Sequence, residues 1–288
     1  MHGWIIIDKP IGMTSTRAVS LVKRLFQVKK AGHGGTLDPL ASGVLPIALG
    51  EATKTLSYVL EGKKAYRFTV TWGEARSTED CEGEITATSP HRPTREDILQ
   101  ILPHFRGEIT QVPPLYSALK VKGERAYDLA RRGEIFELAT RAVTIDALDL
   151  IETTLDAATF EVTCSKGTYV RSLGRDLALQ LGTYGHLSAL RRQMAAPFHE
   201  RNAILLDSLL EMGHKEELLN HVLPLQGALA DILALEVGHE DAKALRQGRT
   251  ISSQGMPEGT ILVTCGTTPQ GLGRVEDGLI QPIRVFNI

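Results

Sequence analysis

The spacing of hydrophobic residues predicts a chain that mixes helices and strands over roughly its first 230 residues. Apolar and polar residues alternate from Tyr66 to Trp72, as in a strand with one buried face. Apolar residues three or four apart follow Thr14 and Thr94 and recur around Leu173, which indicates three amphipathic helices. Further strands are predicted at 4–7, 143–151 and 159–164, and shorter helices at 51–60 and 123–133.

The pattern changes after about Leu233. Short apolar runs separated by turn residues, as in GMPEGTILVTCGTTPQGLGRVEDGLIQPIRVF, predict a small β-rich domain of about fifty residues. The fold class is therefore α+β, with a main domain at 1–232 and an appended domain at 233–288.

Composition places the chain among globular proteins of a reducing compartment. Hydrophobic residues make up 42% and charged residues 23% of the sequence, and no apolar run approaches the roughly 18 residues of a membrane span. The apolar run in MHGWIIIDKP is too short for a signal peptide. Cys81, Cys164 and Cys265 are far apart and form no CxxC motif, which argues against disulfides and zinc. We expect a cytoplasmic protein.

Positive charge gathers near the start of the chain. Residues 1–67 hold ten Lys and Arg against four acidic residues, a net charge of +6, whereas the whole chain carries −2. A basic segment of this kind can face the phosphates of a nucleic acid. A solvated protein surface explains it equally well.

The basic segment surrounds a glycine-rich loop with one carboxylate, GHGGTLDPLASGVLPIALGEATK at 32–54. Clustered glycines indicate an unusual backbone path or close approach to a ligand. A lone Asp38 can act as nucleophile or base without redox or metal chemistry, provided that a cation such as Arg171 keeps it ionised. P-loop, dinucleotide-binding, HExxH and GxSxG motifs are absent, and the nine histidines show no metal-ligand spacing.

Six stretches in order along the chain resemble the TruB family of tRNA pseudouridine-55 synthases. They are DKPIGMTS (8–15), GHGGTLDPLASGVLPIALGEATK (32–54), KKAYRF (63–68), QVPPLYSALKVKGERAYDLAR (111–131), CSKGTYVRSLGRDL (164–177) and LRR (190–192). The tail from 233 resembles the PUA domain that this family often carries.

The resemblance implies a role for each matched residue. The catalytic residues that it implies are Asp38, the catalytic aspartate, Arg171, its paired arginine, and Tyr66, the tyrosine that stacks on the target uracil. The substrate contacts that it implies are Lys9, His33, Tyr66, Tyr169 and Leu190, with Lys9 in the KP motif that supports the site.

The family fold is a mixed, mostly antiparallel sheet flanked by helices, with an RNA-gripping insertion that would fall between about 73 and 140. The reaction isomerises uridine 55 in the T loop by replacing the C1′–N1 bond with a C1′–C5 bond, and it needs no cofactor. The implied partner is the T arm of tRNA. We expect a monomer that requires no metal, no membrane and no protein partner.

Three alternatives remain open. One is a pseudouridine synthase acting on another RNA, because LDPLASGVL also resembles the loop of the ribosomal-RNA enzymes. Another is a guide-RNA-dependent relative, which shares GTLDP, and the last is a non-catalytic KH-like module that uses Gly32–Gly35 as its clamp. The sequence also departs from the family's T-D-T-x-D-x-x-G run, of which ARSTEDCEG keeps Thr78, Asp80 and Gly83.

Overall fold

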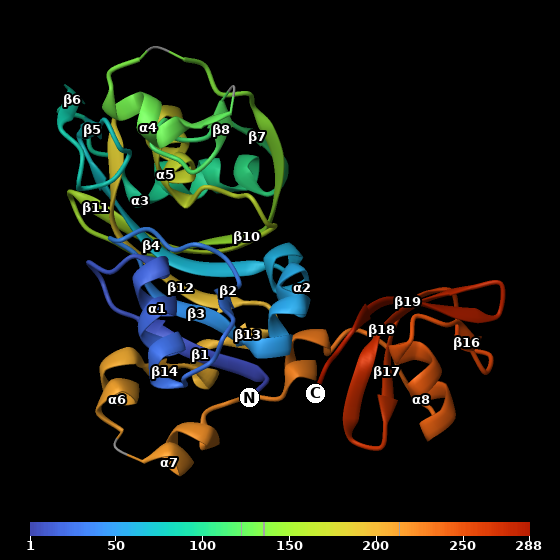
Figure 1. Cartoon of the computed structure of the whole chain (residues 1–288). Coiled ribbons are helices and arrows are strands. Elements are labelled where there is room, and N and C mark those ends of the chain that lie inside the picture. Colours follow the sequence, from blue (N-terminus) through green and yellow to red (C-terminus); the bar gives the residue numbers. More distant parts are fainter. Residues whose placement is uncertain (122, 135, 213) are drawn as a thin grey trace. The chain divides into compact units, whose positions relative to one another are not determined.

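The computed structural model describes residues 1–121, 123–134, 136–212 and 214–288, which fall into two compact units (Figure 1). The first unit comprises Met1–Asp38, Gly43–Glu61 and Ala195–Ile288, and the second comprises Pro39–Ser42 and Gly62–Met194. The predicted α+β class, with a large mixed sheet and a β-rich C-terminal part, is confirmed. The proposed domain boundary at residue 233 stays a prediction.

Strand β1 (Gly3–Lys9) is central to the sheet of the first unit. Trp4 to Ile7 are fully buried, which explains why the segment is a continuous apolar run without alternation. β1 pairs antiparallel with β3 (Ser42–Leu49) and parallel with β14 (Ile204–Leu205), and β2 (Ala31–His33) pairs with β3.

Helices of the first unit begin with α1 (Ser15–Leu25), where the Thr14 hydroxyl accepts a 3.2 Å hydrogen bond from the amide of Arg17. The prediction of one helix at 51–60 is wrong in part. Its first half is the 3-10 helix η1 (Gly50–Thr55), and only α2 (Leu56–Glu61) is α-helical. The other short elements of this unit are β13 (Phe198–His199), η3 (Glu200–Asn202), α6 (Leu206–Glu211), α7 (Lys215–Asn220) and η4 (Leu225–Leu229).

The C-terminal segment forms a five-stranded sheet with one helix, coloured orange to red in Figure 1. Its strands follow the order β15-β17-β18-β19-β16. The bounds are β15 (Ala234–Glu236), α8 (His239–Arg246), β16 (Ile251–Ser252), β17 (Gly259–Cys265), β18 (Thr268–Glu276) and β19 (Leu279–Val285). The β-rich character was predicted from sequence, whereas α8 was not.

This C-terminal sheet shares part of its core with the N-terminal strands. Leu262, Leu272 and Phe286 belong to the same buried cluster as Trp4 and Ile6. Polar contacts add to the apolar ones, because the ammonium of Lys54 donates to the carbonyl oxygen of Val285 at 2.7 Å. Removing the C-terminal segment would therefore expose apolar surface of the N-terminal strands.

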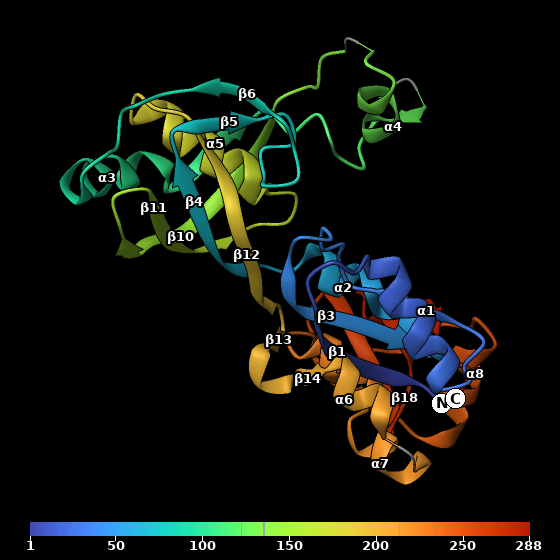
Figure 2. The ribbon, with the colours of Figure 1, turned by 90° about the vertical axis from the view of Figure 1, so that its left-hand side faces the viewer.

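The second unit is built on an antiparallel run of strands in the order β12-β4-β11-β10-β7, and Figure 2 shows β12 beside β4. The rings of Phe68 and Phe160, on neighbouring strands, stack with centroids 5.3 Å apart. The strand bounds are β4 (Lys64–Trp72), β7 (Gly107–Gln111), β10 (Arg141–Thr153), β11 (Ala157–Cys164) and β12 (Gly185–Ala195).

Two helices of this unit confirm sequence signals. α3 (Arg95–Ile101) begins with the predicted Thr94–Asp97 capping box, and α5 (Val170–Gln180) ends before Gly182, which has a φ of +72°. The segment expected to grip RNA holds the remaining elements, and its RNA contacts stay a prediction. They are β5 (Glu74–Arg76), β6 (Ile85–Thr88), η2 (Leu102–Phe105), β8 (Lys120–Val121), β9 (Glu124–Arg125) and α4 (Ala126–Arg131).

Within the described residues, no helix is long and apolar enough to cross a bilayer.

The shared core predicts that a C-terminal side chain stabilises the whole first unit. Phe286→Ala should lower the free energy of unfolding by about 3–5 kcal/mol, because it leaves a cavity in the buried cluster that also contains Trp4 and Leu272. Chemical denaturation followed by Trp fluorescence measures this loss. Ile288→Ala, at a side chain that is 53% exposed, should change stability by less than about 0.5 kcal/mol. Equal small effects of both substitutions would contradict a shared core.

Candidate active site

Asp38 lies in the loop between β2 and β3, at the last residue of the first unit's N-terminal segment. Its neighbour Leu37 is held by the buried hydroxyl of Ser15, which accepts from the Leu37 amide at 2.8 Å and donates to the Leu37 carbonyl at 3.0 Å. A single buried side chain thus fixes both backbone groups of the residue before Asp38. The half-buried aspartate therefore stands on an ordered backbone.

The glycines of this loop have local structural reasons. A Cβ atom added to Gly34 would lie 2.5 Å from Val59, and one added to Gly32 would lie 2.9 Å from Leu56, so both allow the loop to pack on α2. Gly35 has a φ of +127°, a conformation that other residues rarely adopt. Packing against α2 is thus a reason for Gly32 and Gly34 besides the close approach to RNA that the family resemblance implies.

Lys9 and His33 also belong to the first unit. Lys9 is fully buried, and its ammonium donates to the carbonyl oxygens of Pro10 at 2.9 Å and Met13 at 2.8 Å. This geometry fits support of the 10–13 turn, as expected for the KP motif. His33 is half-buried at the end of β2. Direct contact of either residue with substrate stays a prediction.

Arg171 occupies the first turn of α5 in the second unit and is 6% exposed. Its guanidinium donates to the carbonyl oxygens of Thr78 at 2.9 Å and Tyr116 at 3.0 Å. The carboxylate of Asp80 lies 3.6 Å from the same group. Backbone and carboxylate acceptors thus hold this cation in one orientation.

Asp80 is a candidate functional residue that we did not assign from sequence. Its carboxylate is 2% exposed, accepts a 2.5 Å hydrogen bond from the Thr78 hydroxyl and accepts the amide of Glu82 at 3.1 Å. The signal was the partial match of ARSTEDCEG to the family run, because the structure shows that Thr78 and Asp80 face Arg171. The departure in the other positions leaves this pair intact.

Tyr66 lies on β4, and its side chain is hydrogen-bonded to Arg192 of β12. Arg192 is 1% exposed. Burial lowers the pKa of the Arg192 guanidinium, and the contact with Tyr66 opposes that effect. The hydroxyl of Tyr66 therefore has a fixed cationic partner inside the second unit.

Tyr169 directly precedes α5, and its backbone is fixed by the buried side chain of Gln111. The Gln111 amide group donates to the Tyr169 carbonyl at 3.2 Å and accepts from its N–H at 3.1 Å. The guanidinium of Arg141 lies 5.3 Å from the centroid of the Tyr169 ring, a cation–π distance. Leu190 is buried on β12.

The predicted residues therefore form two groups, each described within its own unit. Lys9, His33 and Asp38 belong to the first unit. Tyr66, Tyr169, Arg171 and Leu190 belong to the second, where Tyr169 and Arg171 are brought together at the start of α5.

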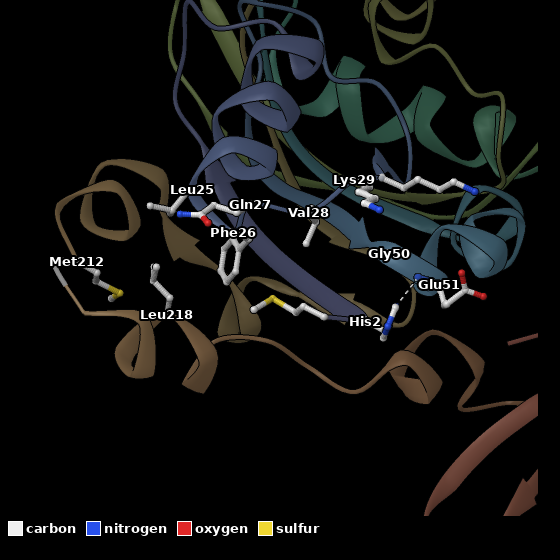
Figure 3. A pocket seen from close by; sticks show the side chains of 12 residues that line it. His2, Leu25, Phe26, Gln27, Val28, Lys29, Gly50, Glu51, Met212 and Leu218 are labelled. Carbon is white, nitrogen blue, oxygen red and sulfur yellow. Dashed lines mark hydrogen bonds between the residues drawn. The ribbon is translucent and has the colours of Figure 1, made fainter. Parts of the chain in front are cut away.

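Each unit also contains a cavity. A cavity of about 720 Å³ in the first unit lies between the end of α1 and the α6–α7 segment, where Phe26, Met212 and Leu218 face it (Figure 3). None of the predicted site residues is among the described residues that line it. A cavity of about 470 Å³ in the second unit is lined by residues that include Glu79, Tyr116 and Arg175. The Tyr116 carbonyl is also an acceptor of Arg171.

The described residues hold no cluster of His, Cys, Asp or Glu suited to a metal.

Family models match the chain from residue 23 to near its end. The model of the TruB family pseudouridylate synthase N-terminal domain matches 23–170, the tRNA pseudouridylate synthase B C-terminal domain matches 171–230, and the pseudouridine synthase II TruB C-terminal model matches 234–286. The chain belongs to the TruB family.

Curated relatives match this chain in sequence over its whole length. The chain is 53% identical to tRNA pseudouridine synthase B of Bradyrhizobium diazoefficiens, covering 100% of this chain and 86% of the relative. It is 48% identical to the protein of the same name from Rhodospirillum rubrum, and this match covers 100% of this chain and 97% of the relative. TruB membership places the chain among isomerases.

Solved structures share the fold. A chain of an H/ACA RNP bound to a substrate RNA that contains 2′-deoxyuridine has a TM-score of 0.77 at 24% identity, and the match covers 99% of this TruB chain and 85% of that chain. A chain of a Cbf5-Nop10-Gar1 complex has a TM-score of 0.76 at 26% identity, and the match covers 98% of this chain and 84% of that chain.

The buried Asp80–Arg171 pair predicts a stability cost when its charge is removed. Asp80→Asn keeps the shape of the side chain but leaves Arg171 without its carboxylate, so the free energy of unfolding should fall by about 3 kcal/mol. Asp156→Asn breaks the exposed pair with Arg92 and should cost less than about 1 kcal/mol. Urea denaturation of both variants measures the difference, and similar losses would show that Asp80 does not stabilise the buried cation.

Proposed function

We propose that this TruB protein converts uridine 55 in the T loop of tRNA to pseudouridine. Supporting this, relatives named tRNA pseudouridine synthase B are about half identical to it over its whole length. The observation that carries the proposal is that two residues of the TruB motifs are held in fixed orientations. Asp38 follows Leu37, whose backbone groups are both hydrogen-bonded to Ser15, and the guanidinium of Arg171 is held by three acceptors.

In the reaction, Asp38 starts cleavage of the C1′–N1 bond, either by attacking the sugar as nucleophile or by removing a proton as base. The freed uracil turns and its C5 bonds to C1′. On the nucleophile route this step breaks the bond between Asp38 and C1′, and on the base route the proton that Asp38 took returns to the atom it came from. The proton then leaves C5 and N1 gains a proton. The isomerisation is redox-neutral, and every atom of the uridine is kept. On the TruB resemblance, Arg171 is the arginine that serves Asp38 in this step.

The target base must leave the stack of the folded T loop before a carboxylate can reach its sugar. Stacking on an aromatic ring offsets part of this cost, by roughly 1–3 kcal/mol per base. Tyr66 supplies that ring, and the hydrogen bond to buried Arg192 restricts where the ring can lie. Lys9, His33, Tyr169 and Leu190 complete the substrate contacts in this proposal.

We infer a monomeric enzyme without an obligatory protein partner. Relatives named tRNA pseudouridine synthase B, a name that mentions no partner protein, match this chain from end to end, whereas the structural neighbours are parts of larger complexes. The KH-like module loses its support, because TruB proteins are enzymes and because packing on α2 also accounts for Gly32 and Gly34.

The test of this function is incubation with an unmodified tRNA transcript, followed by chemical mapping of pseudouridine. We expect a single modified position, in the T loop. A transcript with cytidine at that position should remain unmodified. Product elsewhere, or none on the uridine transcript, would overturn the proposal.

Asp38→Asn separates a catalytic role from a structural one. The variant keeps the size of the side chain but removes its charge, so turnover should fall by at least roughly 10²–10⁴-fold while tRNA affinity stays similar. Rates of pseudouridine formation at saturating tRNA, with filter-binding affinities, measure both. Thr36→Ala, an exposed change in the same loop, should keep near-normal turnover. Activity of Asp38→Asn above about one per cent of the parent would refute the assignment.

A further inference from the structure

Glu79 has a backbone conformation that is unusual for a glutamate. Its φ is +63°, in the left-handed region that favours glycine and asparagine. The turn is nevertheless fixed to β12, because the Glu79 carbonyl accepts the amide of Leu187 and the Cys81 amide donates to the Leu187 carbonyl, both at 3.0 Å. Contacts of the Glu79 side chain must offset the strain of this conformation.

Those contacts reach two side chains of α5. The carboxylate of Glu79 pairs with the guanidinium of Arg175, and the hydroxyl of Ser172 lies 3.1 Å from its second oxygen. Burial raises the pKa of the Glu79 carboxyl, and the charge of Arg175 and the Ser172 contact offset part of this rise. The side chain is 13% exposed, so the pair is largely shielded from water.

Arg175 and Ser172 also hold the start of the 112–116 segment. The guanidinium of Arg175 donates to the Val112 carbonyl at 3.0 Å, and the Ser172 hydroxyl lies 2.9 Å from the same oxygen. The Tyr116 carbonyl, four residues further on, accepts from Arg171. The same short segment therefore contacts both arginines.

The two arginine–carboxylate pairs, Arg171 with Asp80 and Arg175 with Glu79, join the same helix to the same turn. Arg171 and Arg175 are four residues apart and therefore share one face of α5. Their acidic partners, Asp80 and Glu79, are consecutive residues of one turn. A displacement of the turn at Glu79 must therefore move Asp80 and the acceptors around Arg171.

We propose that Glu79 is a positioning residue for Arg171. Its carboxylate fixes Arg175 and Ser172, these fix Val112, and the turn and the 112–116 segment together keep the Arg171 guanidinium in its catalytic orientation. The inference rests on the proposed function in one respect, namely that Arg171 serves Asp38 during uridine isomerisation. Glu79 itself contacts no reacting atom.

The kinetic test compares Glu79→Gln with the parent on unmodified tRNA. The amide keeps the shape but removes the charge that orients Arg175, so kcat should fall roughly 10- to 100-fold, as expected for a displaced catalytic group, with KM changed less than about threefold. Glu82→Gln, an exposed change in the same turn, should leave both constants unchanged. Turnover of Glu79→Gln equal to that of the Glu82→Gln control would overturn the proposal.

A second readout does not depend on activity. Hydrogen–deuterium exchange in residues 112–121 should be faster in Glu79→Gln than in the parent, because Val112 loses its fixed donors, and unchanged exchange would overturn the proposal. Arg175→Lys keeps the charge but cannot reach Glu79 and Val112 together, so it should show the same acceleration even if Glu79→Gln folds poorly. If the parent forms no pseudouridine, the proposed function fails, and exchange in these variants still decides whether Glu79 positions the segment.

Discussion

A buried guanidinium, that of Arg171, constrains how the second unit folds around the candidate site. Arg171 is shielded from water, so its charge and its N–H groups need acceptors inside the protein. The chain supplies them from two separate stretches: the turn at 78–80 gives the carbonyl of Thr78 and the carboxylate of Asp80, and the 112–116 segment gives the carbonyl of Tyr116. Both stretches must reach their places for the guanidinium to be satisfied. The site therefore forms together with the fold of this unit.

The same principle recurs where backbone is held beside a residue with a proposed function. A buried Ser15 binds both backbone groups of Leu37, next to Asp38, and a buried Gln111 does the same for Tyr169, two residues before Arg171. In each case one short polar side chain replaces the hydrogen bonds that a regular ladder would give. The loops can thus be irregular and still ordered, as precise positioning of a catalytic group requires.

Sequence patterns predicted the long periodic elements well, because burial of one face dictates their spacing. The capping box at Thr94 and the strand from Tyr66 are examples. Strand β3 was missed because Gly43 and Pro46 resemble loop residues, although Pro46 lies opposite Ile6 in the sheet. The motif match supplied Asp38, Tyr66 and Arg171, whereas Glu79 depends on a turn and a helix nearly a hundred residues apart, which no local pattern reveals.

The most direct measurement is the single-turnover rate of pseudouridine formation by Arg171→Lys at saturating tRNA. Lysine keeps the positive charge but lacks the planar fork that reaches the carbonyls of Thr78 and Tyr116 together. If the fixed geometry of the guanidinium is what serves Asp38, the rate should fall by roughly 10²-fold or more with tRNA affinity unchanged. A rate within about threefold of the parent would show that charge alone suffices and would contradict the account.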